Sequence, residues 1–369
     1  MGRARRGGGC ALLFLIVVGA VGLGVYYKFF RPEPSNLPPA SGDELRVHVL
    51  DVGQGDAVLV VAPGGKTALI DAGNPGNGKK ILAALQREGV QQIDLFVATH
   101  AHADHIGAAD EVIKGTTVSA VLDSKIPNET KNYEDFLKAI EDRGVRYIGA
   151  EPNQTFDMGG GAVLTVLAPI PPPFTKDQLR SGGNEPNANS VVLRLDYGDF
   201  SMLFTGDAEA QTEQRMIEQE ARLEADVLKV GHHGSKYATS EDLLRRGRFK
   251  TAVISCGYDN RYGHPSPEVL ARLKAADVKL YRTDLQGEIK ITTKGREDDV
   301  KIDAERRAEE DLWAGREAKR DDSTRSGFIQ YGDFGPANRN RNANGNNANN
   351  RNANNRNANA RNANNANRR

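Results

Sequence analysis

The chain has 369 residues, of which 38% are hydrophobic and 27% charged, a composition typical of globular proteins that excludes disorder along the whole chain. Its 49 basic and 49 acidic side chains cancel overall, but residues 41–335 hold 37 basic and 48 acidic side chains, a net charge of −11. Such a charge excludes nucleic-acid binding through bulk electrostatic attraction alone.

The N-terminus has the pattern of a membrane signal. Residues 1–10 hold three arginines, and residues 11–27 are an uncharged apolar stretch of 17 residues, the lower limit for a helix that crosses a bilayer. The preceding positive charges predict a cytoplasmic N-terminus and a single-pass protein in which everything after Arg31 lies outside the cytoplasmic membrane. The alternative is a cleaved signal peptide and a secreted protein. Residues 28–44 form a proline-rich linker.

Residues 45–295 alternate short β-rich runs with helical patterns. In the first half we expect strands at 45–50, 57–61, 68–70 and 93–98 and helices at 79–87 and 133–143. In the second half we expect strands at 163–167, 191–195, 201–204, 227–230, 252–255, 280–282 and 288–292 and helices at 209–220, 241–246 and 267–275. This order predicts two sheets covered by outer helices, and residues 45–295 are numerous enough to form one such domain.

The C-terminal part is expected to lack a core of its own. Residues 296–336 read as a charged, partly helical extension, with a helix over 303–320 anchored by Trp313. Residues 337–369 are almost only Asn, Arg and Ala, with no aromatic or branched apolar side chain to bury, so we expect a disordered tail.

A cluster of metal-binding residue types begins where the strand expected at 93–98 ends. His100 and His102 are two apart in extended chain and point to the same side, and Asp104 and His105 follow as the chain turns into a helix. Three imidazoles and one carboxylate within six residues suit zinc or a similar divalent ion.

Two later segments supply further candidate ligands. Thr-Gly-Asp, which ends at Asp207, follows one expected strand, and Gly-His-His-Gly, with His232 and His233, follows another. Either segment alone is weak evidence, because a carboxylate after a strand is usually a turn residue. Together with the first cluster they predict a two-metal site.

The order of these motifs resembles the metallo-β-lactamase superfamily. The accompanying motifs are LDVGQGDA at 50–57, IDAG at 70–73, NS at 189–190, LKV at 228–230 and GHP at 263–265. With them, residues 45–292 are similar to the extracytoplasmic hydrolase domain of the ComEC competence-protein family, without that family's many membrane spans. The resemblance implies an α/β (α+β) fold, a four-layer αββα sandwich that holds metal ions in loops at one edge.

The resemblance also implies roles for the clustered residues. His100 and His102 match ligands of a first ion, Asp104 and His105 match ligands of a second, Asp207 matches the bridging carboxylate, and His233 matches the last ligand. The expected catalytic residues are Asp104, His102 and Asp207. Two-zinc members place another histidine before the bridging carboxylate, but this chain has none between 105 and 207. Asn189 matches the ComEC pattern there, and an amide oxygen is a weak zinc ligand, so the first position is expected to be poorly filled or to suit Mn²⁺.

Other side chains are expected to support the site or contact the substrate: Gln54, Asp56, Asp71, Asn189, Lys229, His232, Ser235 and His264. Gln54 and Asp56 lie in a turn that either faces the metal ions or only needs its glycines. Asp71 is expected to brace the metal-binding loops. Lys229 and Ser235 are candidates for phosphate binding, with turn capping as the alternative for Ser235. His232 is either a substrate contact or an alternative ligand, and His264 either reaches the site or caps a loop.

These residues predict a metal-dependent hydrolase that uses one or two Zn²⁺, or Mn²⁺, and a metal-bound hydroxide oriented by Asp104. The ComEC resemblance favours a phosphodiesterase, with nucleic acid as a candidate partner. One alternative is a hydrolase of a small ester, thioester or lactam, and another is a non-catalytic metal-containing surface binding protein. No oligomeric state is predicted.

Overall fold

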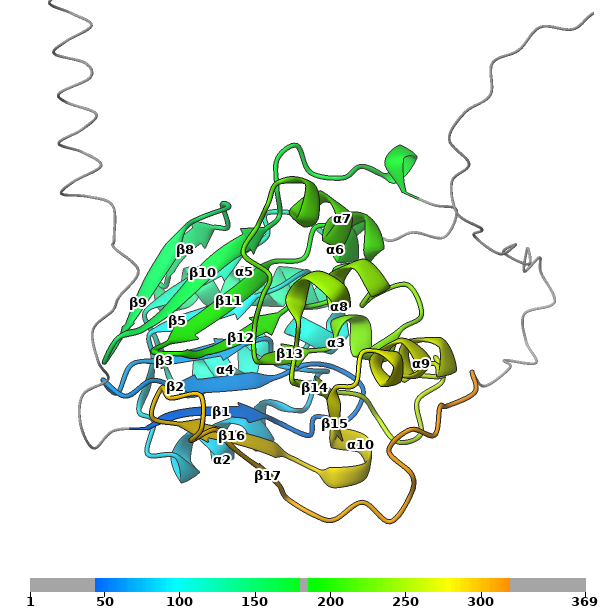
Figure 1. Ribbon diagram of the computed structural model, residues 1–369. Coiled ribbons are helices and arrows are strands. Elements are labelled where there is room, and N and C mark those ends of the chain that lie inside the picture. Colours follow the sequence, from blue (N-terminus) through cyan, green and yellow to red (C-terminus); the bar gives the residue numbers. More distant parts are fainter. Residues whose placement is uncertain (1–43, 180–184, 319–369) are drawn as a thin grey trace, which may run out of the picture. The chain divides into compact units, whose positions relative to one another are not determined.

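The computed structural model describes residues 44–179 and 185–318 (Figure 1). The expected basic N-terminus, membrane segment 11–27 and tail 337–369 lie outside the described residues, as does the linker up to residue 43. Within the described ranges, none of the helices has the length and apolar character needed to cross a membrane.

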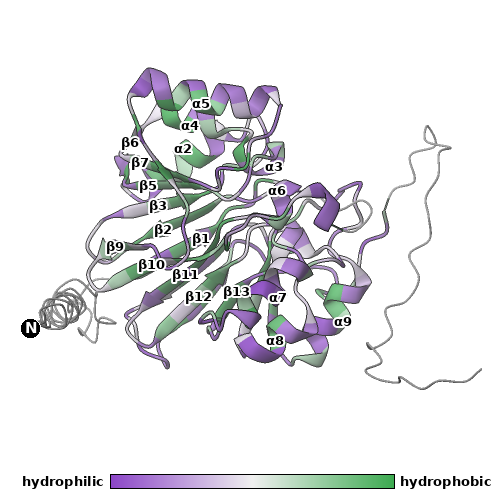
Figure 2. Ribbon diagram, turned by 90° about the horizontal axis from the view of Figure 1, so that it is seen from above, coloured by the Kyte–Doolittle hydropathy of each residue, from purple (hydrophilic) through white to green (hydrophobic). Residues whose placement is uncertain are grey.

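Two mixed β-sheets pack face to face in the described part of the chain (Figure 2). The first has the strand order β17 (Lys301–Ala304), β16 (Ile289–Thr293), β1 (Leu45–Val49), β2 (Val58–Val61), β3 (Thr67–Ile70), β5 (Leu95–Ala98), β7 (Ala120–Asp123) and β8 (Arg146–Gly149). The second has the order β15 (Lys279–Arg282), β14 (Thr251–Ile254), β13 (Val227–Lys229), β12 (Phe200–Phe204), β11 (Val192–Tyr197), β10 (Ala162–Ala168) and β9 (Thr155–Gly159). Two short strands, β4 (Gln92–Ile93) and β6 (Thr117–Val118), pair separately.

Helices cover the outer face of each sheet, which completes the αββα sandwich (Figure 2). The first sheet carries α2 (Gly78–Arg87), α4 (Ala109–Gly115) and α5 (Lys131–Arg143), and the second carries α7 (Ala210–Glu218), α8 (Glu241–Gly247) and α9 (Pro267–Ala275). Shorter turns of helix are α3 (Ala103–Ile106), η1 (Lys176–Gln178), α6 (Glu185–Ala188), η2 (Gly231–Gly234) and α10 (Thr283–Gln286). Local sequence sets the ends of α5, because the Thr130 side chain accepts a hydrogen bond from the Tyr133 N–H and Gly144 adopts a φ of 61° after the last turn.

Apolar side chains fill three layers of core. One cluster lies between the sheets, and the other two lie between each sheet and its helices. Strands β2, β3 and β5 are buried at every position, which explains why they read in the sequence as continuous apolar runs.

The parallel strands determine where the site is built. In the first sheet β3 is parallel to β5, and in the second sheet β12, β13 and β14 are parallel to one another. Their carboxyl ends therefore meet at one edge of each sheet, and in such sheets functional loops follow the carboxyl ends of strands.

Two expected elements need correction. The strand predicted over 93–98 is two strands, β4 and β5, because Asp94 interrupts the run and accepts a hydrogen bond from the Thr67 N–H at 2.8 Å. The helix predicted over 303–320 is wrong for its described part, since β17 ends at Ala304 and no helix follows up to residue 318.

Residues 305–318 instead form an irregular segment, here called the C-terminal strap (orange in Figure 1). The fully buried Arg282 donates hydrogen bonds to the carbonyl oxygens of Leu312 and Ala314 at 2.8 and 2.6 Å. Trp313 packs against the core layer between the second sheet and its helices. The backbone N–H of Arg316 donates to the Pro265 oxygen at 3.0 Å. These contacts with residues distant in the sequence hold the strap in a non-helical conformation. The local charge pattern, which predicted a helix, contains no information about them.

Candidate metal centre

Five strand ends contribute to one cluster, four of them through side chains and the fifth through the carbonyl oxygen of Ser255, which lies 3.1 Å from His233 Nδ1. Asp71 follows β3, the histidine-rich segment follows β5, Asp207 follows β12, the paired histidines follow β13, and Ser255 follows β14. The sheet topology, which makes all five strands end at the same edge, brings these distant segments of the sequence together.

Four candidate ligands, here called the compact group, are Asp104, His105, Asp207 and His233, whose ligand atoms lie within 4.8 Å of one another. The Nε2 atoms of His105 and His233 face each other at 3.2 Å. Asp207 Oδ1 lies 3.2 Å from His105 Nε2 and 3.6 Å from His233 Nε2, and Asp104 Oδ2 lies 3.3 Å from His233 Nε2. The residues therefore present two nitrogen and two oxygen donors to one point.

Asp71 orients His105 within this group. His105 Nδ1 donates to Asp71 Oδ2 at 2.7 Å, which leaves Nε2 directed at Asp207. The same carboxylate accepts hydrogen bonds from the N–H and hydroxyl of Thr99 at 2.8 and 2.7 Å. Metal-binding histidines usually donate their second ring N–H to a carboxylate or a carbonyl oxygen. Asp71 is the residue of the IDAG motif that was expected to brace the metal-binding loops.

The other oxygen of Asp207 faces a second set of donors. Asp207 Oδ2 lies 3.8 Å from His100 Nε2 and 3.6 Å from His232 Nε2. His102 Nδ1 lies 2.9 Å from His100 Nε2, and the two rings meet edge to face. The two oxygens of one carboxylate are thus shared between two groups of imidazoles.

A divalent cation fits this arrangement on the chemistry of its donors. Asp207 Oδ1 is buried without a hydrogen bond, although a buried carboxylate oxygen normally has a partner. Burial raises the pKa of Asp207, but His105, His232 and His233 lower it well below its ordinary value, so the carboxylate is ionised. Burial likewise raises the pKa of Asp104, but His233 and His105 lower it. Ionised carboxylates between facing imidazole nitrogens match the donors that zinc and manganese accept.

Comparison with known proteins agrees with this geometry. Residues 50–258 match the family model described as the Metallo-beta-lactamase superfamily. The chain belongs to this superfamily. ComE operon protein 3 of Bacillus subtilis is 32% identical over 300 residues, which cover 76% of this chain and 36% of that protein. Recombination protein 2 of Haemophilus influenzae is 32% identical over 67% of this chain and 28% of that protein. A UPF0173 metal-dependent hydrolase of Cupriavidus necator is 34% identical over 23% of this chain.

The chain spans about a third of the length of the first two relatives. As a member of the metallo-β-lactamase superfamily with hydrolase relatives, it is a metallo-hydrolase, and its relatives place it near the ComEC-like proteins.

The side chain of Lys229 is buried in an ion pair, so its ammonium is not exposed for the phosphate-binding role predicted for it. Its side chain is 1% exposed, and Nζ pairs with Asp56 Oδ2 at 2.8 Å and donates to the Val230 oxygen at 2.9 Å. Burial raises the pKa of Asp56, but Lys229 and His233 lower it to about 2. Asp56 Oδ1 in turn lies 3.3 Å from His233 Nδ1. The ion pair of Lys229 and Asp56 therefore helps to orient His233, a candidate ligand of the metal centre.

Asn189 and Ser235 also point away from the centre. Asn189 accepts a hydrogen bond from the Phe174 N–H at 2.8 Å and donates to the oxygens of Phe174 and Glu185, each at 2.9 Å. It fixes the backbone around α6 and offers no free amide oxygen to an ion. Ser235 is buried and accepts from the Tyr237 N–H at 3.3 Å, which corresponds to the turn-capping alternative.

Gln54 and His264 lie together at the rim of the cluster. Gln54 Nε2 is 3.5 Å from His264 Nδ1, and its Oε1 accepts from the Gly257 N–H at 3.1 Å. The His264 ring lies 5.5 Å from that of His232, and burial together with the charges of His233 and His232 lowers the pKa of His264 to about 3. The turn also needs glycine, since a Cβ at Gly55, whose φ is +144°, would lie 2.4 Å from the Asp104 oxygen.

Two residues beside the cluster were not among the candidate site residues expected from the sequence. Ser190 Oγ accepts from the Asp207 N–H at 3.3 Å and lies 3.4 Å from His100 Nδ1. Asn187 Nδ2 lies 3.4 Å from His232 Nε2, whereas its buried Oδ1 makes no hydrogen bond. Ser190 belongs to the NS motif at 189–190 and Asn187 lies two residues before it, so the motif alone does not identify the amide that faces the histidines.

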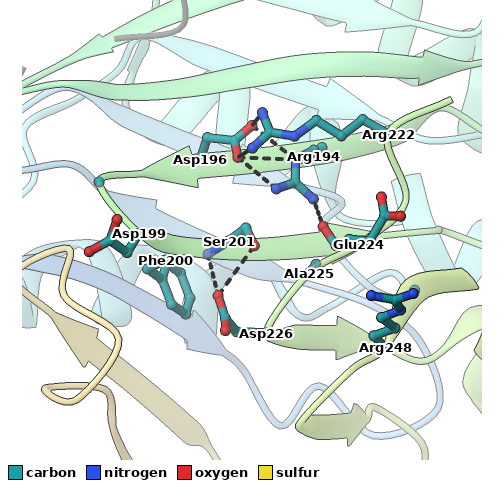
Figure 3. A pocket seen from close by; sticks show the side chains of 12 residues that line it. Arg194, Asp196, Asp199, Phe200, Ser201, Arg222, Glu224, Ala225, Asp226 and Arg248 are labelled. Carbon is teal, nitrogen blue, oxygen red and sulfur yellow. Dashed lines mark hydrogen bonds and ion pairs between the residues drawn. The ribbon is translucent and has the colours of Figure 1, made fainter. Parts of the chain in front are cut away.

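Away from this edge, the described residues form no further group of histidines and carboxylates that could hold an ion. Figure 3 shows a pocket beside the amino ends of β12 and β13, at the opposite end of these strands from Asp207. Two of its arginines pair with the same carboxylate, since Arg194 and Arg222 lie 2.8 and 3.3 Å from Asp196 (Figure 3). Cys256 is fully buried, and burial raises the pKa of its thiol well above the ordinary value, so it is not a nucleophile.

Proposed function

We propose that this metallo-hydrolase is a phosphodiesterase whose hydrolase domain acts outside the cytoplasmic membrane. The observation that carries the proposal is the position of Asp207, whose Oδ1 faces His105 and His233 while Oδ2 faces His100 and His232. A carboxylate placed between two groups of imidazoles suits a pair of ions. Paired ions are common in enzymes that hydrolyse phosphate esters.

The residues of the chain divide into two sets of ligands. His100 and His102 would hold one ion, and Asp104, His105 and His233 would hold the other, with Asp207 between them. Such ions polarise a phosphoryl oxygen, activate water and stabilise the charge of the leaving oxygen. We propose zinc as the resident ion, with manganese as the alternative.

Asp104 has the position of a group that handles the attacking water. Its side chain is 25% exposed, whereas those of His105, Asp207 and His233 are at most 2% exposed. It is therefore the carboxylate of the compact group that water reaches. Because its pKa lies below the ordinary range, the carboxylate is ionised at neutral pH and can orient the water and accept a hydrogen bond from it.

Nucleic acid is the proposed substrate class. The name of Recombination protein 2 refers to a process that acts on DNA, and the arginine cluster ahead of apolar residues 11–27 favours an external catalytic domain. The net charge of −11 over residues 41–335 favours a smaller ester or lactam as the second candidate, because a domain of that charge repels a polyanion.

The test is cleavage of bis-p-nitrophenyl phosphate by the purified full chain supplied with Zn²⁺ or Mn²⁺. We expect Asp104→Ala to abolish metal-dependent cleavage. The matched control is Asp110→Ala, because Asp110 lies on α4 and pairs with Lys114 at 2.7 Å, and we expect it to retain the wild-type rate. Equal rates for the wild type and Asp104→Ala would contradict the mechanism. Cleavage of p-nitrophenyl acetate or a chromogenic lactam without cleavage of the phosphodiester would favour the second candidate.

A further inference from the structure

The backbone at His232 is strained in a way that the compact ligand group does not explain. His232 and His233 are consecutive residues with positive φ angles of 48° and 54°. Glycine adopts such angles without a steric penalty, whereas a residue with a side chain does not. His233 belongs to the compact group, but a glycine at 232 would serve the same turn with less strain. Strain of this kind is typical of functional sites, so the His232 side chain itself needs an explanation.

The His232 ring faces the donors on the far side of Asp207. Its Nε2 lies 3.6 Å from Asp207 Oδ2, the atom that also lies 3.8 Å from His100 Nε2. Its Nδ1 lies 3.6 Å from Glu209 Oε1, a placement that directs Nε2 toward the cluster. With His102 next to His100, three imidazoles lie on the Oδ2 side of Asp207.

Asn187 places its side-chain amide next to His232. Its side-chain nitrogen lies 3.4 Å from His232 Nε2, and its Oδ1 is buried without a hydrogen bond. A buried acceptor without a partner is unfavourable, and few such groups persist in native proteins. Amide oxygens are suitable ligands for Mn²⁺ among the divalent ions. Rotation of the amide, which exchanges Oδ1 and Nδ2, would turn this acceptor toward an ion held by His232 and give it the partner it lacks.

We infer that His232 and Asn187 complete the first metal position together with His100, His102 and Asp207. His232 thereby replaces the histidine that is absent between residues 105 and 207, and it comes from the strand end that also supplies His233. This inference rests on the two-metal centre of the proposed function but concerns only which residues hold the first ion. It predicts a set of three imidazoles, one carboxylate and one amide, which accepts Mn²⁺.

The test measures the metal content of the full chain after equilibrium dialysis against Mn²⁺ alone. We expect two ions per chain in the wild type and one in both His232→Gly and Asn187→Ala. We expect electron paramagnetic resonance to change from the signal of a coupled Mn²⁺ pair to that of an isolated ion. His264→Ala is the matched control, because its ring lies close to that of His232 but its Nδ1 faces Gln54, and it should retain two ions.

The outcomes separate this inference from the proposed function. His232→Gly relieves backbone strain, so its urea midpoint without metal should equal or exceed that of the wild type, and a lost ion then cannot be attributed to misfolding. Two ions in both variants would overturn the inference, as would a single ion in the wild type. In either case, metal-dependent cleavage of bis-p-nitrophenyl phosphate would leave the proposed function standing. A wild type that binds no ion would overturn both.

Discussion

Replacing Lys229 by methionine should lower the free energy of unfolding by about 3–5 kcal/mol, because the buried carboxylate of Asp56 loses its ammonium partner and keeps only the longer contact of Oδ1 with His233. The two side chains are 1% and 4% exposed, and the Nζ–Oδ2 distance is 2.8 Å, so water cannot replace the lost ammonium. Methionine has a similar length and is apolar, which limits the effect of lost packing.

The magnitude follows from burial, and an exposed lysine provides the matched control. Lys250 pairs with Asp226 and Glu297 at 3.0 and 2.7 Å, but its side chain is 56% exposed. Lys250→Met should therefore cost no more than about 1 kcal/mol. The double variant Asp56→Asn/Lys229→Met should be more stable than the sum of the single effects predicts by about 1–3 kcal/mol, because neither charge is then left unpaired.

The assay is urea unfolding of the metal-free protein, followed by far-ultraviolet circular dichroism and by the fluorescence of Trp313, the single tryptophan. Chelator is present throughout, so that loss of a bound ion does not contribute. Additive single effects, or a loss below about 1 kcal/mol for Lys229→Met, would refute the reasoning. An unchanged stability with a raised KM would instead support the phosphate-binding role that the sequence suggested for Lys229.

Three further predictions follow. Asp71→Asn should weaken metal affinity about 10–100-fold, measured by competition with a chelator, because it removes the charge that orients His105. Deleting 337–369, which removes seven arginines, should leave bis-p-nitrophenyl phosphate turnover unchanged and reduce the salt dependence of DNA binding. Burial raises the pKa of Glu288, but the hydrogen bond from His48 lowers it below the ordinary value of a glutamate. The ionised carboxylate therefore stabilises the fold at pH values above the ordinary pKa, and this stabilisation is lost as the pH falls through the lowered pKa. Acid unfolding of Glu288→Gln should accordingly depend less steeply on pH.

The local pattern of the sequence predicts most of the sandwich. Runs such as 58–61 and helix signals such as the serine before Pro267 depend on neighbouring residues, so periodicity and capping reveal them. The HAHADH segment also identifies its own chemistry, because its candidate ligands lie within six residues.

Features that depend on distant partners were not predictable in this way. Lys229 carries the same charge whether it binds phosphate or Asp56, and Asp56 lies 173 residues earlier in the chain. The choice between Asn187 and Asn189 depends on which side of a four-residue helix turns toward His232. The first question is decided by the packing of one sheet against the other, and the second by the loops that precede β11 and follow β13 in the second sheet.

The C-terminal strap and β17 determine where the hydrolase domain can be cut. A protein that ends at residue 295, the boundary that the sequence pattern suggests, would leave the buried guanidinium of Arg282 without the carbonyl oxygens of Leu312 and Ala314. It would also turn β16 (Ile289–Thr293) into an exposed strand at the border of its sheet, where unpaired backbone groups promote aggregation. In the longer protein β17 is the edge strand instead, and its exposed Lys301 and Asp303 disfavour pairing with another chain. A soluble fragment therefore requires a C-terminal boundary beyond residue 318.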